Sequence, residues 1–131
     1  MQYNFTAWGH ENITASHKRT LEFTKEGELS IQGDCILGVN ADFSLYDLKE
    51  LIKQGKRLKI IIKVDGVSDE VVFEANPGFS DEREIVIRMG DFGSSRTFGV
   101  RADKACSNLK KELVDKLNNP NQKIEVLITH I

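Results

Sequence analysis

The chain has 131 residues, of which 40% are hydrophobic and 29% are charged, and its formal net charge is −2 at pH 7. This length predicts a single domain over residues 1–131, and the slightly acidic balance argues against binding to duplex nucleic acid. The two cysteines are too few for a disulfide framework, and the sequence shows neither a secretory signal nor an apolar run of membrane-spanning length. We therefore expect a cytoplasmic protein.

The first predicted elements are strands. Residues 13–23 alternate with a period of two, which predicts a strand or a bent pair of strands and places His17 and Arg19 on its mostly apolar face. The run 35–39 is short, rich in β-branched and apolar residues, and apolar on both sides. This pattern is typical of a central strand that is covered on both faces.

A helix and a hairpin follow. Ser44 is placed to cap a helix that ends at Gly55, and apolar residues recur along it at helical spacing. Residues 58–75 alternate on both sides of Asp65-Gly66, a two-residue sequence that favours a tight turn. The register that this turn imposes puts the apolar side chains of both strands on one face.

The last part of the chain predicts strands at 84–89, 97–100 and 123–129, with a helix after Asp103. That helix is expected to turn four side chains inward, those of Cys106, Leu109, Leu113 and Leu117. Several connections between strands are too short for crossovers. The sequence therefore predicts an α+β fold with two α-helices and a largely antiparallel, strongly curved sheet or partly closed β-barrel.

A first group of chemically versatile side chains comprises His10, His17, Asp34 and Cys35. Imidazole and thiolate groups are ligands for divalent transition metals, although the spacing here is wider than in most structural zinc sites. A second alternative is a Cys35 nucleophile with His17 as its base. A third is purely structural, with Cys35 as a small core residue and His17 bonded within the sheet, where Glu22 or Asp34 would be a natural partner.

A second group lies in the C-terminal half, where Arg96 and Thr97 follow the Gly93-Ser94-Ser95 loop and Lys104 stands at the expected start of the second helix. Arginine binds carboxylate or phosphate through two parallel hydrogen bonds, and the first amides of a helix also favour anions. The group therefore predicts a binding site for a small anion. Alternatively, the loop only joins two strands and its charges are solvated.

At these residues the chain resembles an archaeal family known as domain of unknown function 371. The resemblance rests first on the N-terminal residues Gly9-His10-Glu11-Asn12-Ile13, His17, Thr20-Leu21-Glu22, Thr24, Gly33-Asp34-Cys35-Ile36 and Gly38-Val39. It rests also on Ser95-Arg96-Thr97, Ala102-Asp103-Lys104-Ala105, Leu109 and Glu112-Leu113-Val114. The resemblance implies an archaeal, cytoplasmic protein and points to the same two groups of residues, but it implies no activity.

The resulting hypothesis is a pocket for a phosphorylated or carboxylated metabolite, bordered by both groups. Arg96, Thr97 and Lys104 would hold the anion, and the His10, His17, Asp34 and Cys35 side would be catalytic or would bind a divalent metal. If the protein is an enzyme, histidine would be the general base and Asp34 its orienting group or an acid. The alternative is a non-catalytic module that binds RNA or protein, and a homodimer stays open.

Overall fold

The computed structural model describes residues 2–30 and 33–131. The strands are β1 (Gln2–Trp8), β2 (Thr20–Thr24), β3 (Ile36–Gly38), β4 (Arg57–Val64), β5 (Val67–Ala75), β6 (Glu84–Arg88), β7 (Thr97–Val100) and β8 (Lys123–His130). The helices are α1 (Leu45–Lys53), α2 (Lys111–Val114) and the 3-10 helix η1 (Cys106–Asn108). Among the helices of these ranges, none has the length and apolar character needed to cross a membrane.

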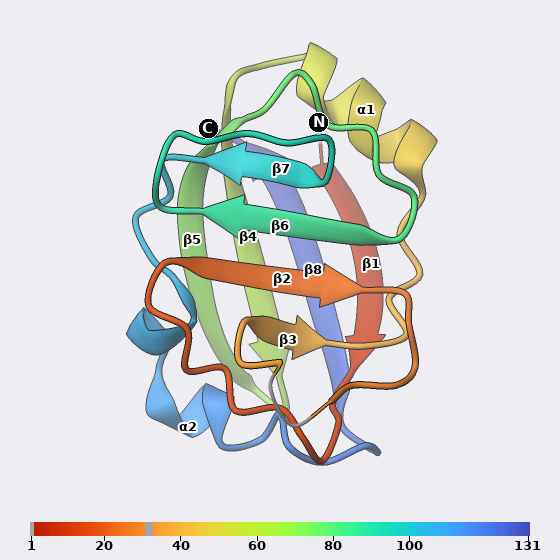
Figure 1. Cartoon of the computed structure of the whole chain (residues 1–131), viewed down its shortest axis with the longest axis vertical. Coiled ribbons are helices and arrows are strands. Elements are labelled where there is room, and N and C mark those ends of the chain that lie inside the picture. Colours follow the sequence, from red (N-terminus) through yellow and green to blue (C-terminus); the bar gives the residue numbers. More distant parts are fainter. Residues whose placement is uncertain (1, 31–32) are drawn as a thin grey trace.

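All the named strands belong to one sheet, in the order β1-β8-β4-β5-β7-β6-β2-β3. Figure 1 shows that the sheet folds over, so that a front layer of β7, β6, β2 and β3 crosses a rear layer of β5, β4, β8 and β1. The β2–β3 and β6–β7 pairs are parallel and the other pairs are antiparallel. The predicted α+β class with a largely antiparallel sheet is therefore confirmed.

The sheet is not closed into a barrel along its length, but its two outer strands approach each other. Trp8, at the end of β1, and Val39, just after β3, form a single bridge with two backbone hydrogen bonds of 2.8 Å. The next turn of chain adds a bond from the Asp42 amide to the Thr6 carbonyl. These contacts protect part of the β1 edge, which would otherwise expose unpaired backbone groups.

The hydrophobic core lies between the two layers. Phe5 of the rear layer packs edge-on against Phe23 of the front layer, with ring centroids 5.5 Å apart, and Phe73 contacts Phe98 at 5.7 Å. Alternation along each strand turns these rings inward, as the period-two pattern requires. Consequently the other side chains of every strand face outward, and the front layer presents an outer face of its own.

The hairpin and the first helix agree with the sequence. Val64 pairs with Val67 and Ile60 with Val71, as predicted. The turn residues Asp65 and Gly66 have φ angles of 49° and 81°, which are the positive values that a two-residue turn of this kind needs. The amide of Asp47 donates to the Ser44 hydroxyl over 3.3 Å, so the predicted cap of α1 is confirmed.

The prediction of a strand over 13–23 is wrong in its first half, because only Thr20–Thr24 pairs in the sheet. Ala15 has a φ of 47°, which interrupts extended backbone. Beyond it, the His17 ring accepts the amides of Arg19 and Thr20 and forms a local turn. His17 and Arg19 therefore precede the strand, and Arg19 is exposed rather than placed on an apolar face.

The run 35–39 does form a strand, but it lies at the edge of the sheet and not in its centre. Its burial comes from the other layer, because a Cβ added at Gly38 would lie 2.9 Å from the Ala7 Cβ and 3.0 Å from a methyl group of Ile124. Contacts across the core, rather than two neighbouring strands, thus explain why this segment is apolar on both sides.

The second helix is divided and does not begin after Asp103. The Asp103 carboxylate accepts the Val72 amide over 3.0 Å instead of capping a helix, and only the short η1 and α2 follow. No helix therefore starts at Lys104 among the residues placed here, and that part of the predicted anion site is wrong. The four side chains expected to face inward, from Cys106 to Leu117, are all buried.

Replacing Gly66 by alanine tests the turn. Because L residues adopt a φ of 81° only with strain, we expect Gly66→Ala to lower the free energy of unfolding by about 1–2 kcal/mol in urea denaturation. Gly78→Ala is the matched control, since its nearest neighbour atom would be 3.5 Å from the new Cβ and its φ is unstrained. Equal stability of the two variants would contradict the assigned turn.

Candidate functional site

The outer face of the front layer carries a buried carboxyl group. Leu21 and Phe23 of β2 point into the core, so Glu22 between them points to the opposite face. There it lies between Val86 of β6 and Ile36 of β3 in the strand register. Glu22 is only 5% exposed, an unusual position for a carboxyl group unless it is paired or protonated.

Three side chains surround this carboxyl group and with it form what we call the Glu22 cluster: Glu22, Cys35, Glu84 and Arg96. The Cys35 thiol donates to Glu22 Oε1 over 3.8 Å, and Arg96 Nη1 lies 3.7 Å from the same oxygen. Arg96 Nη1 also donates to Glu84 Oε1 over 2.9 Å, and a hydrogen bond joins the two carboxyl groups. The cluster thus combines an acid, a carboxylate, a thiol and a guanidinium group.

Electrostatics keeps a proton in this cluster. Burial, together with the hydrogen bond to Glu84 and the charge of that residue, raises the pKa of Glu22 to about 8, although Arg96 and Cys35 act in the opposite direction. Two adjacent carboxyl groups cannot easily both ionise, so they share one proton while the guanidinium balances the remaining charge. At pH 7 Glu22 is therefore mainly the neutral acid.

Cys35 lies in the cluster as a thiol rather than as a thiolate. Burial, followed by the charges of Glu22 and Asp34, raises the pKa of Cys35 to about 11. Since only the thiolate is strongly nucleophilic, this environment favours Cys35 as a hydrogen-bond donor to Glu22. Cys106 is buried behind it, and its thiol donates to the Cys35 carbonyl over 3.2 Å.

The predicted residues Arg96 and Thr97 adjoin each other but have different contacts. Thr97 is fully buried, and its hydroxyl accepts from Arg88 Nε at 3.2 Å and from the Ser94 amide at 3.1 Å. It therefore holds the loop that precedes β7 in place. By fixing that loop, Thr97 positions Arg96 over the outer face of the sheet.

His17 and Asp34 approach the cluster through their backbone. The His17 amide donates to the Asp34 carbonyl over 3.1 Å, next to Cys35 in the chain. The His17 ring uses Nδ1 to accept the amides of Arg19 and Thr20, each at 3.1 Å, and also contacts the Thr20 hydroxyl. This ring is thus oriented by the start of β2, and no contact joins it to Cys35 in the ranges that the structure covers.

His10 lies elsewhere, against the C-terminal part of the chain. Its amide donates to the Leu117 carbonyl over 3.0 Å, and its ring accepts the Asn12 amide through Nδ1 at the same distance. The adjoining Gly9 is needed there, because a Cβ would come within 2.3 Å of the Asn119 carbonyl oxygen. Among the residues described, no three His, Cys, Asp or Glu side chains are arranged to hold a metal ion.

Lys104 belongs to a different ion pair, with the buried Asp69, beside the part of β5 that β7 does not pair with. Its Nζ donates to Asp69 Oδ1 over 2.7 Å and to the Glu70 carbonyl over 2.9 Å, while Asp69 Oδ2 accepts the Lys110 amide. Burial alone would raise the pKa of Asp69, but these hydrogen bonds outweigh it and leave the pKa lowered. Lys104 therefore closes a strand edge and makes no contact with Arg96.

Comparison with known proteins identifies the family. Residues 5–131 match the family described as domain of unknown function (DUF371). The chain belongs to this family. It is also similar to the uncharacterised protein MJ0206 of Methanocaldococcus jannaschii, with 33% identity over 134 residues that cover 98% of this chain and 99% of that protein. The resemblance predicted from the two groups of residues is confirmed.

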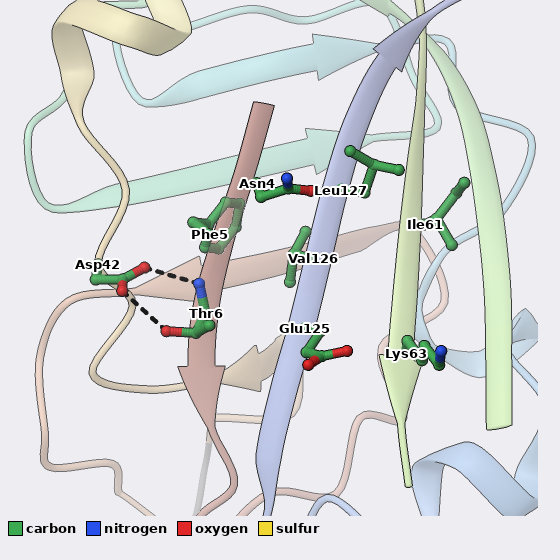
Figure 2. Close-up of a pocket in the computed structure, with 9 residues that line it drawn as sticks. All are labelled: Asn4, Phe5, Thr6, Asp42, Ile61, Lys63, Glu125, Val126 and Leu127. Carbon is green, nitrogen blue, oxygen red and sulfur yellow. Dashed lines mark hydrogen bonds between the residues drawn. The ribbon is translucent and has the colours of Figure 1, made fainter. Parts of the chain in front are cut away.

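The surface hollows described for this DUF371 protein are not lined by the predicted site residues. One groove of about 580 Å³ crosses the outer face of the rear layer, over β1, β8 and β4 (Figure 2). The Glu22 cluster lies instead on the sheet surface of the front layer, where Arg96 is its most exposed member. Of the seven residues predicted for one pocket, Cys35 and Arg96 meet at the same oxygen of Glu22, and His17 contacts Asp34 through the backbone.

Protonation of Glu22 makes stability depend on pH. Its folded-state pKa lies above its unfolded value, so its contribution is complete below about pH 4.5 and is lost as pH rises through about 8. As the pH rises from about 4.5 to about 8, we expect the unfolding free energy of the wild type to decrease relative to that of Glu22→Gln. The decrease is at most about 1.4 kcal/mol for each pH unit by which the folded-state pKa exceeds the unfolded-state pKa. Urea denaturation across this range measures it, with Glu28→Gln as an exposed control. A constant difference between wild type and Glu22→Gln would contradict the assignment.

The Asp69 pair has the opposite pH dependence. Because the folded-state pKa of Asp69 is lowered, its stabilising contribution is present at neutral pH. The contribution is lost as the pH falls below the unfolded-state pKa and then through the folded-state pKa. We expect Asp69→Asn to destabilise the protein by roughly 2–3 kcal/mol at pH 7 and by less in acid. The exposed pair of Asp65 and Lys116 supplies the control, and Asp65→Asn should cost little. Similar losses in both variants would refute a special role of Asp69.

Proposed function

We propose that this cytoplasmic protein binds a small metabolite that carries a phosphate or carboxylate group, with Arg96 as the anion-binding residue and Glu22 as a general acid. The observation that carries the proposal is that the exposed guanidinium group of Arg96 lies 3.7 Å from a buried carboxyl group whose pKa is raised to about 8. A positive charge and a transferable proton are thus available at one point of the surface.

Arg96 has the donors that an anion needs. Its side chain is 44% exposed, and its bonds to the cluster run through Nη1. Within the described ranges, Nε and Nη2 have no partner, so their adjacent N–H groups can donate to a ligand. A guanidinium group binds carboxylate or phosphate oxygens through two such parallel bonds, whereas the Lys104 ammonium is already committed.

Glu22 is suited to proton transfer because its pKa of about 8 lies close to physiological pH. An anion on Arg96 would draw positive charge away from the two carboxyl groups and favour the protonated state of Glu22. Cys35 donates to the same carboxyl oxygen, and Asp34 and His17 adjoin Cys35 through the backbone. Their role in this proposal is to orient the acid. His10 has no part in it.

The partly closed shape of the sheet supports the site. We infer that the sheet forms a partly closed barrel. In it, the Trp8–Val39 bridge holds the segment after β3 against the end of β1. Because Cys35 directly precedes β3, this anchor also fixes the position of its thiol beside Glu22.

A second candidate function is binding of single-stranded RNA. Phe92 is 66% exposed in the loop after β6, and the Arg88 guanidinium lies 5.5 Å from the centroid of its ring. Exposed aromatic rings with arginine beside them stack on unpaired bases. The acidic net charge argues against this alternative as the main function.

A thermal-shift comparison tests the proposal with inorganic phosphate, glycerol 3-phosphate and succinate as probes. A ligand that binds the native state raises the melting temperature, so we expect at least one probe to stabilise the wild type but not Arg96→Gln. Arg83→Gln is the matched control, because Arg83 forms an ion pair with Glu26 in which both side chains are exposed.

Equal shifts in Arg96→Gln and the wild type would exclude Arg96 as the anion-binding residue. Stabilisation by a uridine oligonucleotide alone, abolished in Phe92→Ala, would favour the RNA-binding alternative instead.

A further inference from the structure

The groove on the rear layer is a second hollow with its own chemistry. It has a volume of about 580 Å³ and runs over the outward side of β1, β8 and β4 (Figure 2). Volumes of this order are typical of small-molecule sites in proteins. The groove shares no residue with the Glu22 cluster, so the inference drawn from it stands independently of the function proposed above.

The end of the groove beside Asn4 has an apolar floor. Leu127 of β8 and Ile61 of β4 are paired in the strand register, and both are partly exposed on the outer face. Asn4 of β1 is the partner of Leu127 on the other side. An apolar body of modest size can therefore lie across the three strands and cover these two side chains.

One end of the groove carries two opposite charges that are not used by the protein. Lys63 and Glu125 are cross-strand partners and both are exposed. Neither side chain has an ion pair or hydrogen bond within residues 2–30 and 33–131. The next lysine of the same face, Lys59, is by contrast paired with Glu70 over 3.1 Å. The sheet thus holds an unpaired cation and anion side by side.

The remaining polar groups of the groove limit the class of ligand. Asp42 uses both carboxylate oxygens on Thr6, at 2.7 and 2.9 Å, so it contributes negative charge but few free acceptors. The Asn4 side-chain amide is uncommitted among the residues placed here and offers one donor group and one acceptor. Asp42 and Glu125 outweigh the charge of Lys63 and disfavour a simple anion, whereas a simple cation would leave the Lys63 ammonium without a counter-charge.

We propose that this groove binds a small zwitterion with an apolar body, the chemistry of a free apolar L-amino acid. The ligand ammonium group is held by Glu125, its carboxylate by Lys63 and the Asn4 amide, and its side chain lies on Leu127 and Ile61. The ligand completes, through its own two charges, the ion pair that Lys63 and Glu125 do not make with each other.

Calorimetric titration of the whole chain tests this with leucine, isoleucine, methionine and phenylalanine as probes. We expect millimolar or tighter binding of at least one of them, and a loss of about tenfold or more in both Lys63→Met and Glu125→Gln. Lys49→Met and Glu112→Gln are controls, because these charges lie exposed on α1 and α2. Leucinamide and 4-methylpentanoate, which each keep one of the two charges of leucine, should bind more weakly than leucine.

Several results would overturn the proposal. These are the absence of binding by all four amino acids, equal binding of either singly charged analogue, or unchanged binding in both groove variants. Sedimentation that shows a dimer in the wild type and a monomer in Lys63→Met would assign the groove to a second copy of the chain. Arg96→Gln should bind the amino acid normally, so a failure here is distinguishable from a failure of the anion site.

Discussion

The proton shared near Glu22 is the constraint on which the proposed chemistry depends. A carboxyl group that is 5% exposed in the middle of a sheet face cannot stay ionised without compensation. The fold supplies one guanidinium group for two carboxyl groups, and the difference is made up by a proton. Arg96, Glu84 and Cys35 come from three separate segments, so the cluster exists only when the front layer is assembled.

The pair of Lys104 and Asp69 shows a different use of a buried charge. There one cation meets one carboxylate, and the Lys110 amide donates to the remaining oxygen, so the carboxylate is stabilised as an anion. Such a pair closes the edge of β5 and has no proton to give. Arg96 and Lys104 were similar candidates for anion binding in the sequence. The contrast explains why only Arg96 suits that role in the structure, because Arg96 keeps free donors and Lys104 does not.

Local features of the fold could be predicted, and long-range ones could not. The β4–β5 hairpin follows from alternation and from Asp65-Gly66, because both act within a few residues. Strand β1 was not predicted, since its pairing partner β8 lies at the opposite end of the chain. The division of the second helix depends on Asp103 accepting the Val72 amide, which no local pattern reveals.

The candidate site shows the same limit. Cys35 and Arg96 could be singled out by residue type and by the resemblance to the DUF371 family, but their meeting at Glu22 depends on the pairing of β2, β3 and β6. Glu84 and Asp69 were missed because a carboxylate within an alternating strand normally indicates a solvent-facing position. The burial of Asp69 and the partial burial of Glu84 depend on the strands and segments that lie beside them in the folded chain.

The most direct test of this account is the titration of Glu22 itself, followed by the carboxyl carbon resonance of selectively labelled glutamate and assigned with Glu22→Gln. The account predicts a midpoint near 8 for this one resonance. A midpoint near the ordinary glutamate value of about 4.3 would show that no proton is held there at neutral pH, and would contradict the assignment of Glu22 as an acid.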